Sequence, residues 1–142
     1  MSLAEVTAAL GADADPEAIG GPDPESCDQF RPARAPEGVL VMMEEGRLTR
    51  VSLINKSAVK TDRGIALGSS AAEVTAAYHG AAASSPHKYR DAPAAYLTYW
   101  SRKTGDKTSP TDRGIVFEVD KGGVVDLIHA GGPSIQHVEG CL

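Results

Sequence analysis

The chain has 142 residues and carries 14 Lys and Arg against 19 Asp and Glu, which is a formal net charge of −5. This length suits one domain of ordinary size, and the negative balance argues against a surface that neutralises phosphates, so we expect no nucleic-acid partner. No run of about 18 apolar residues occurs, so we expect no membrane-spanning helix.

The chain starts with a pattern typical of a short amphipathic helix. Ser2 and Glu5 have the spacing of a capping box, in which each side chain bonds the backbone amide of the other residue. Val6 and Leu10 are four residues apart and would form one apolar stripe. We therefore predict a helix over residues 2–10.

β-structure is expected after a polar loop rich in Asp, Pro and Gly. Residues 27–31 form a candidate first strand. The clearest hairpin pattern has apolar arms over 39–43 and 48–54, joined by the Glu-Glu-Gly-Arg segment 44–47. Residues 55–64 are polar and turn-rich, and we expect them to join two halves of the chain.

The second half opens with a repeat of the first helical pattern. The hexapeptide Ala-Glu-Val-Thr-Ala-Ala at residues 4–9 recurs at residues 72–77, and Ser70 and Glu73 again have capping-box spacing. We predict a second helix over 70–79. Two Ala-rich capped helices can also share such a pattern by chance, and the sequence leaves that alternative open.

A loop and three further strands complete the predicted order. The loop covers 80–93, and 95–100 form an aromatic strand. A second hairpin has arms over 115–120 and 124–130, and 135–138 are expected to form a last short strand.

Helix followed by antiparallel strands, twice in succession, indicates the α+β class. We expect two tandem modules, each a helix and then antiparallel strands, over residues 1–60 and 61–142. The two modules would form one sheet in one compact domain, with the helices packed on one face.

The two cysteines, Cys27 and Cys141, show no metal-ligand spacing. We interpret them as one disulfide, which favours an oxidising, extracytoplasmic compartment, whether periplasmic, envelope-attached or secreted. Two buried free thiols and a catalytic cysteine are the alternatives. No signal-peptide pattern occurs, and the sequence begins at the first predicted helix, so we expect any signal peptide or lipid anchor to lie upstream.

Two sets of residues carry a family resemblance. They are Ser2, Glu5, Val6, Leu10 and Gly11 in the first half, and Gly68, Ser69, Ser70, Glu73, Val74 and Tyr78 in the second. Together with the order of helix, loop and antiparallel strands, they resemble the fold of β-lactamase inhibitory protein and of the small lipoproteins of outer-membrane assembly. The resemblance implies a bacterial envelope or secreted module, although a single cysteine pair departs from the inhibitor pattern.

The second half also resembles a group of uncharacterised secreted or envelope bacterial proteins. The residues that carry this resemblance are Gly64, Ile65, Leu67, Gly68 and Ser69 through Tyr78, then Pro86 to Tyr89, Tyr96, Leu97, Ile115, Phe117, Glu118 and Glu139 to Cys141. This resemblance implies a location and no activity.

The sequence contains no phosphate loop, no metalloprotease motif and no hydrolase nucleophile motif. The four histidines are isolated, and no two have the spacing of paired metal ligands; His129 and His137 could face each other across neighbouring strands. We therefore expect no enzymatic activity, no cofactor and no metal site.

The densest polar and aromatic cluster is Pro-His-Lys-Tyr-Arg-Asp at residues 86–91, in the predicted loop. It is either a solvated loop that Tyr89 anchors to the sheet or a recognition surface. The candidate binding residues are His87, Lys88, Tyr89, Arg90, Tyr96, Tyr99 and Trp100.

The leading hypothesis is an extracytoplasmic protein-interaction or envelope structural module. Its exposed sheet face, or the loops 80–93 and 101–112, would meet a protein partner. The alternative is a small-molecule or glycan binder that uses the aromatic strand 95–100 and the loop 86–91.

Overall fold

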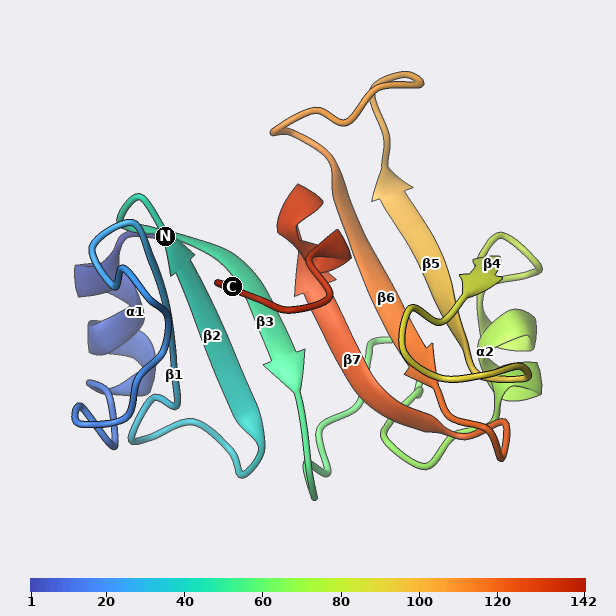
Figure 1. The fold of residues 1–142 in the computed structure, drawn as a ribbon, viewed down its shortest axis with the longest axis horizontal. Coiled ribbons are helices and arrows are strands. Elements are labelled where there is room, and N and C mark those ends of the chain that lie inside the picture. The colour runs from blue at the N-terminus through green and yellow to red at the C-terminus, as the bar shows by residue number, and fades with distance from the viewer.

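The computed structural model describes residues 1–142 and contains one sheet of seven antiparallel strands with two α-helices (Figure 1). The strand order is β1-β2-β3-β7-β6-β5-β4, so β3 and β7 adjoin in the interior of the sheet. The predicted α+β class is confirmed. In chain order the elements are α1 (Leu3–Leu10), β1 (Cys27–Phe30), β2 (Val39–Glu44), β3 (Arg47–Leu53), α2 (Ala71–Ala77), β4 (Ala83–Pro86), β5 (Ala95–Arg102), β6 (Arg113–Val119), β7 (Val125–Gly131) and the 3₁₀ turn η1 (Pro133–Gln136).

Both predicted helices are present, and both begin with the predicted capping box. In α1 the backbone N–H of Ser2 donates to Glu5 Oε2 at 2.6 Å, and the N–H of Glu5 donates to Ser2 Oγ at 3.3 Å. In α2 the same reciprocal bonds join Ser70 and Glu73, at 3.3 and 3.0 Å. Each bond satisfies an amide that the first helical turn leaves free.

The residues that precede the two helices bond to corresponding strand ends. The N–H of Leu48, near the start of β3, donates to the carbonyl oxygen of Met1 at 2.8 Å. The N–H of Val125, at the start of β7, donates to the carbonyl oxygen of Ser69 at 2.8 Å. The helices themselves lie toward opposite ends of the sheet (Figure 1).

One face of the sheet, which we call the helix face, is apolar. The strand register aligns Val41, Val51, Ala130, Ile115 and Tyr99 across β2, β3, β7, β6 and β5 on this face. Successive side chains of a strand alternate between faces, so an apolar residue at every second position builds one continuous apolar layer.

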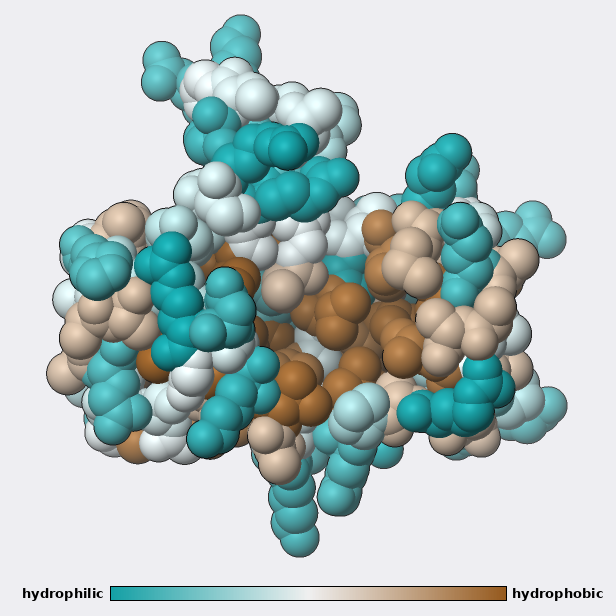
Figure 2. Space-filling view, turned by 180° about the vertical axis from the view of Figure 1, so that it is seen from behind, coloured by the Kyte–Doolittle hydropathy of each residue, from teal (hydrophilic) through white to brown (hydrophobic).

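Two buried clusters form where the helices pack on this layer. Val6 of α1 packs with Phe30, Val41 and Met43, and Val74 of α2 belongs to a cluster that includes Phe117 and Leu97. Between the helices, apolar side chains remain visible on the molecular surface (Figure 2).

The opposite face, which we call the tail face, is more polar. Leu40, Ser52, His129, Val116 and Thr98 stand opposite one another across β2, β3, β7, β6 and β5. The last ten residues of the chain, 133–142, pass in front of this face (Figure 1). We call these residues the tail.

The predicted last strand over 135–138 is wrong, because the tail begins with the 3₁₀ turn η1. Both edges of β7 are already paired, to β3 and to β6, so the chain finds no free edge at β7 when it turns back. Pro133 also lacks the N–H that a ladder needs. The N–H groups of Ile135 and His137 donate instead to the carbonyls of Gly132 and Ser134.

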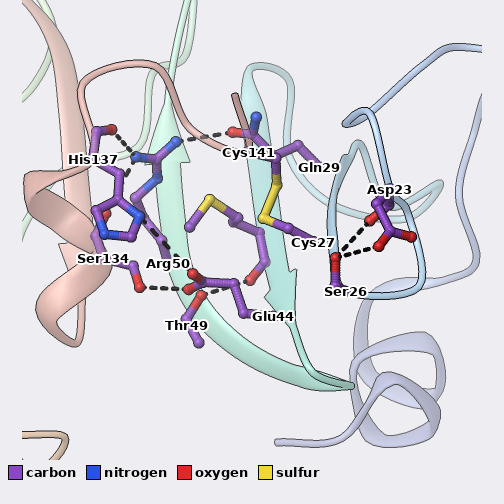
Figure 3. The surroundings of a disulfide bond; sticks show 11 residues. Asp23, Ser26, Cys27, Gln29, Glu44, Thr49, Arg50, Ser134, His137 and Cys141 are labelled. Carbon is purple, nitrogen blue, oxygen red and sulfur yellow. Dashed lines mark hydrogen bonds and ion pairs between the residues drawn. A yellow bond between two sulfur atoms is a disulfide. The ribbon is translucent and has the colours of Figure 1, made fainter.

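The predicted disulfide between Cys27 and Cys141 is present, with a Cα–Cα distance of 5.5 Å. Cys27 lies at the start of the edge strand β1, and Cys141 lies near the end of the tail. The bond therefore joins the tail to an edge of the sheet, beside a group of polar side chains (Figure 3).

The loop predicted over 80–93 contains the short edge strand β4, which pairs with β5. Its sequence, Ala-Ser-Ser-Pro, has little intrinsic preference for a strand. The backbone hydrogen bonds that the outer edge of β5 offers override that weak local preference, and Pro86 is tolerated at an edge.

Candidate functional site

The predicted binding residues divide between the two faces of the sheet. Tyr96 and Trp100 alternate with their neighbours onto the tail face, on the side of Thr98. Tyr99 lies on the helix face, where its ring centroid is 4.6 Å from that of Tyr78 and 5.0 Å from the guanidinium of Arg63. The structure therefore does not bring Tyr99 together with the other candidates.

His87 and Lys88 do meet Tyr96. The ring of His87 stacks on the ring of Tyr96 with a centroid distance of 4.6 Å and an interplanar angle of 22°. The backbone N–H of Lys88 donates to the Tyr96 hydroxyl at 3.2 Å. These contacts place the start of the loop 86–91 against the tail face.

Arg90 fastens the other end of the same loop. Its NH1 donates to Asp126 Oδ2 at 2.6 Å, in an ion pair whose side chains are about one-third exposed. Tyr89 is 59% exposed. The interpretation that Tyr89 anchors the loop to the sheet is wrong, because His87 and Arg90 make the anchoring contacts and leave Tyr89 in solvent.

Four polar side chains form one hydrogen-bonded chain beneath this loop. His87 Nε2 lies 3.0 Å from Glu118 Oε1, and His129 Nε2 lies 3.0 Å from Glu118 Oε2. His129 Nδ1 lies 2.7 Å from Ser52 Oγ. The sheet register positions three of them, because Ser52 on β3 pairs directly with His129 on β7 and Glu118 lies on the adjacent β6.

A backbone contact determines which nitrogen of the neutral His87 ring carries the hydrogen. The N–H of Tyr89 donates to His87 Nδ1 at 3.1 Å, so this nitrogen carries no hydrogen. In the neutral ring Nε2 then carries the hydrogen and donates it to Glu118. His129 also donates from Nε2 to Glu118, and in its neutral form it accepts the Ser52 hydroxyl hydrogen at Nδ1.

Burial and hydrogen bonding act against each other at Glu118, which is 5% exposed. Burial raises its pKa, but hydrogen bonds and charge interactions with His129, and then with His87, outweigh burial and lower the pKa below its ordinary value. Glu118 is therefore held as a carboxylate between two imidazoles.

A pocket of about 200 Å³ opens beside this carboxylate. Its polar lining is Ser85, Tyr96, Thr98, Glu118, His129 and Gln136, and its apolar lining is Val116, Ile135 and Val138. The strands supply the floor, whereas the tail supplies Ile135, Gln136 and Val138. Lys88 of the loop and Glu139 of the tail are joined by an ion pair at 3.4 Å, so the loop and the tail meet beside the pocket.

A second polar group holds the tail in place (Figure 3). Arg50 is 4% exposed, and its NH1 donates to the carbonyl of His137 at 2.7 Å while its NH2 donates to Gln29 Oε1 at 2.9 Å. The Ser134 hydroxyl donates to Glu44. Burial lowers the pKa of Arg50, and the charges of Glu118 and Glu44 oppose that effect. His137 Nδ1 lies 3.9 Å from Glu44 Oε1, so His137 points toward Glu44 and is not on a strand beside His129, the arrangement that the sequence left open.

Ser52, His129 and Glu118 stand in the order of a nucleophile, a base and a carboxylate. Ser52 is 2% exposed, however, and does not line the pocket. A nucleophile must reach the reacting atom of its substrate. We therefore assign these three residues to the organisation of the pocket wall.

The loop between β5 and β6 is organised around Asp112, which is fully buried. Its carboxylate accepts from the N–H of Ser109 at 2.9 Å, from the N–H of Thr104 at 3.0 Å and from Lys103 Nζ at 3.0 Å. The bond from Ser109 is the main cause that lowers the pKa of Asp112, burial opposes it, and the bonds from Lys103 and Thr104 add to the lowering. This loop therefore has a polar core of its own.

Sequence reasoning missed Glu118, Ser52, Gln136 and Arg50 as site residues. A signal for Glu118 was present, because it is a charged residue within the apolar run Ile115–Val119. A buried charge needs partners, so this residue pointed to histidines elsewhere in the chain.

No group of three or more His, Cys, Asp and Glu side chains is arranged to hold a metal ion. Neither helix has the length and apolar character needed to cross a bilayer. Comparison of the chain with protein-family models, with curated proteins and with solved structures found no match.

Proposed function

We propose that the protein is a binding module whose ligand site is the tail-face pocket beside Glu118. The observation that carries the proposal is a buried carboxylate held ionised by two histidines at the wall of a pocket. Perturbed ionisable groups in a cleft are typical of functional sites. The hydroxyl groups of Ser85 and Thr98 line the pocket but form no hydrogen bond to a histidine that could serve as a base, so binding is favoured over catalysis.

The pocket favours a small neutral ligand with hydroxyl or amide donors. Each oxygen of Glu118 accepts one hydrogen from a histidine and has a further lone pair for a ligand. Thr98, Ser85 and Gln136 add hydroxyl and amide groups. The volume of about 200 Å³ lies below the roughly 300–1,000 Å³ of drug-sized sites, so the ligand would be of monosaccharide size.

Backbone amide NMR with a panel of neutral monosaccharides and small amides tests this proposal. At least one compound should shift the resonances of Ser85, Thr98 and Gln136, and Glu118→Gln should abolish that shift. Glu139→Gln is the matched control, because it removes an exposed carboxylate outside the pocket lining. A panel that leaves all three resonances unmoved would contradict the proposal.

We also propose that the chain consists of two tandem modules, over 1–60 and 61–142, and that its fold resembles that of β-lactamase inhibitory protein. The matched bonds of Leu48 with Met1 and of Val125 with Ser69 support the tandem arrangement. The disulfide supports an extracytoplasmic location, because such bonds persist in oxidising compartments.

A second candidate function is protein binding, favoured by an exposed apolar group beside the pocket. Tyr89 is 59% exposed, Leu142 is 87% exposed and Val138 is 37% exposed. Loop and tail are joined by the Lys88–Glu139 pair, and exposed aromatic and aliphatic residues of this kind are typical of contact surfaces. A partner from an envelope extract should bind the wild type stoichiometrically and lose affinity for Tyr89→Ser/Leu142→Ser. Equal recovery by both proteins would exclude this surface.

A further inference from the structure

A second cavity, of about 290 Å³, lies where β3 and β6 begin and β7 ends. Three arginines, Arg47, Arg50 and Arg113, contribute to its lining. It is separate from the tail-face pocket, since the two cavities share no lining residue.

None of these three arginines forms an ion pair, whereas Arg90, Lys88 and Lys103 all do. Arg113 NH1 donates only to the carbonyls of Pro110 and Asp112, at 2.8 and 2.6 Å. Arg47 has no side-chain hydrogen bond. Arg47 and Arg113, which have no ion-pair partner, stand out in a chain of net charge −5, and their positive charges attract an anion.

The side chain of Arg50 points to the tail face, opposite to that of Val51 on the same strand, and bonds His137 and Gln29 there. Its Nε is buried and has no hydrogen-bond partner, although its two terminal nitrogens are bonded. Arg47 and Arg113 are therefore the arginines that can meet a ligand in this cavity.

The remaining part of the cavity lining is apolar. Leu48, Val51 and Ala130 contribute to it, and each is half-buried. Leu48 and Val51 also pack against the buried cluster under α1. The apolar lining adjoins the surface between the helices, where hydrophobic side chains gather (Figure 2). Positive groups next to an apolar wall match a ligand that has a charged end and an apolar body.

We propose that this cavity binds an organic carboxylate with an apolar body. The guanidinium groups of Arg47 and Arg113 would hold the carboxylate, because the arginine fork matches two carboxylate oxygens. Leu48, Val51 and Ala130 would cover the hydrocarbon part. The proposal is independent of the ligand proposed for the tail-face pocket.

Amide NMR titration of the full chain with octanoate tests the proposal, with octanamide and inorganic phosphate as matched probes. Octanoate should shift Thr49, Gly131 and Gly132, which line the cavity, and should leave Ser85 and Thr98 unmoved. Octanamide lacks the charge and phosphate lacks the apolar body, so both should bind at least tenfold more weakly. Equal binding of octanamide or of phosphate would overturn the proposed ligand class.

Substitution of Arg47 supplies the second test, because its side chain makes no hydrogen bond whose loss would disturb the fold. Arg47→Gln should weaken octanoate binding by about tenfold, the loss expected when one charge-assisted hydrogen bond is removed, and Arg47→Lys should restore part of it. Arg31→Gln removes the same charge outside the cavity and should bind octanoate as the wild type does. Unchanged affinity of Arg47→Gln, or octanoate shifts at Ser85 and Thr98 in place of Gly131, would overturn the site.

Discussion

The two faces of the sheet are covered by different kinds of interaction. On the helix face, Val6 and Val74 insert from α1 and α2 into apolar clusters, and Phe117 has no exposed surface. On the tail face, Arg50 and the disulfide hold the covering segment, and Glu118 is buried among histidines. Apolar contact is non-directional, whereas hydrogen bonds require defined geometry.

Two neighbouring residues of β6 illustrate the different roles of the two faces. Phe117 and Glu118 are adjacent in sequence and point to opposite faces. Phe117 contributes burial and therefore stability, whereas Glu118 fixes the position of two rings beside a pocket. We infer that the helix face supplies the stability that lets the tail face keep a costly buried carboxylate.

Loss of the disulfide should have the largest effect. The bond joins residues 114 apart in sequence, and by loop entropy Cys27→Ser/Cys141→Ser should lower the free energy of unfolding by about 4–5 kcal/mol. Urea unfolding measures this change. The tail should also become mobile in the folded protein, so amide exchange at Gln136 should rise while exchange at Phe117 stays slow. Equal protection of both residues would contradict the distinction between the faces.

Phe117→Ala should cost about 3–5 kcal/mol in the free energy of unfolding, because it opens a void in the largest buried cluster. Val116→Ala on the opposite face of the same strand should cost about 1–2 kcal/mol, since it removes fewer atoms and they border an existing pocket. Both values come from urea unfolding. A larger loss for Val116→Ala would reverse the roles assigned to the faces.

Glu118→Gln should lower the free energy of unfolding by about 2 kcal/mol, because the new amide group faces a histidine N–H and leaves a buried donor unsatisfied. Glu139→Gln, which weakens only an exposed ion pair, should cost less than about 0.5 kcal/mol. Equal stability of the two variants would show that the histidine N–H groups do not need the Glu118 carboxylate as an acceptor.

A fall in pH should weaken the hydrogen bonds of the tail face before it affects the apolar contacts of the helix face. The pKa of Glu118 is lower in the folded protein than in the unfolded chain, so its contribution is present above the unfolded pKa of about 4.3 and is lost as pH falls through the folded value. Unfolding measured between pH 7 and 3 should show a smaller loss of stability in Glu118→Gln than in the wild type. Parallel curves would show that Glu118 has the same pKa in both states.

Local patterns predicted the helices and the hairpins, and two cysteines without metal-ligand spacing predicted the disulfide. The capping boxes at Ser2 and Ser70 are local, since each needs only four residues. The tail face was not predictable in the same way, because Ser52, Glu118 and His129 meet only through strand register. The tail was missed because its turn depends on both edges of β7 being occupied, which no short segment of sequence reveals.

The central claim is that the Glu118 carboxylate is buried between two histidines that donate to it. The position of the hydrogen on the His87 ring tests this claim most directly. Nitrogen-15 NMR of the imidazoles distinguishes the two neutral forms of a ring from its charged form. In the neutral His87 ring the hydrogen should lie on Nε2, because the Tyr89 amide donates to Nδ1 and Nε2 faces Glu118. A neutral His87 ring with its hydrogen on Nδ1 would contradict the hydrogen-bonded chain that runs from His87 through Glu118 to His129.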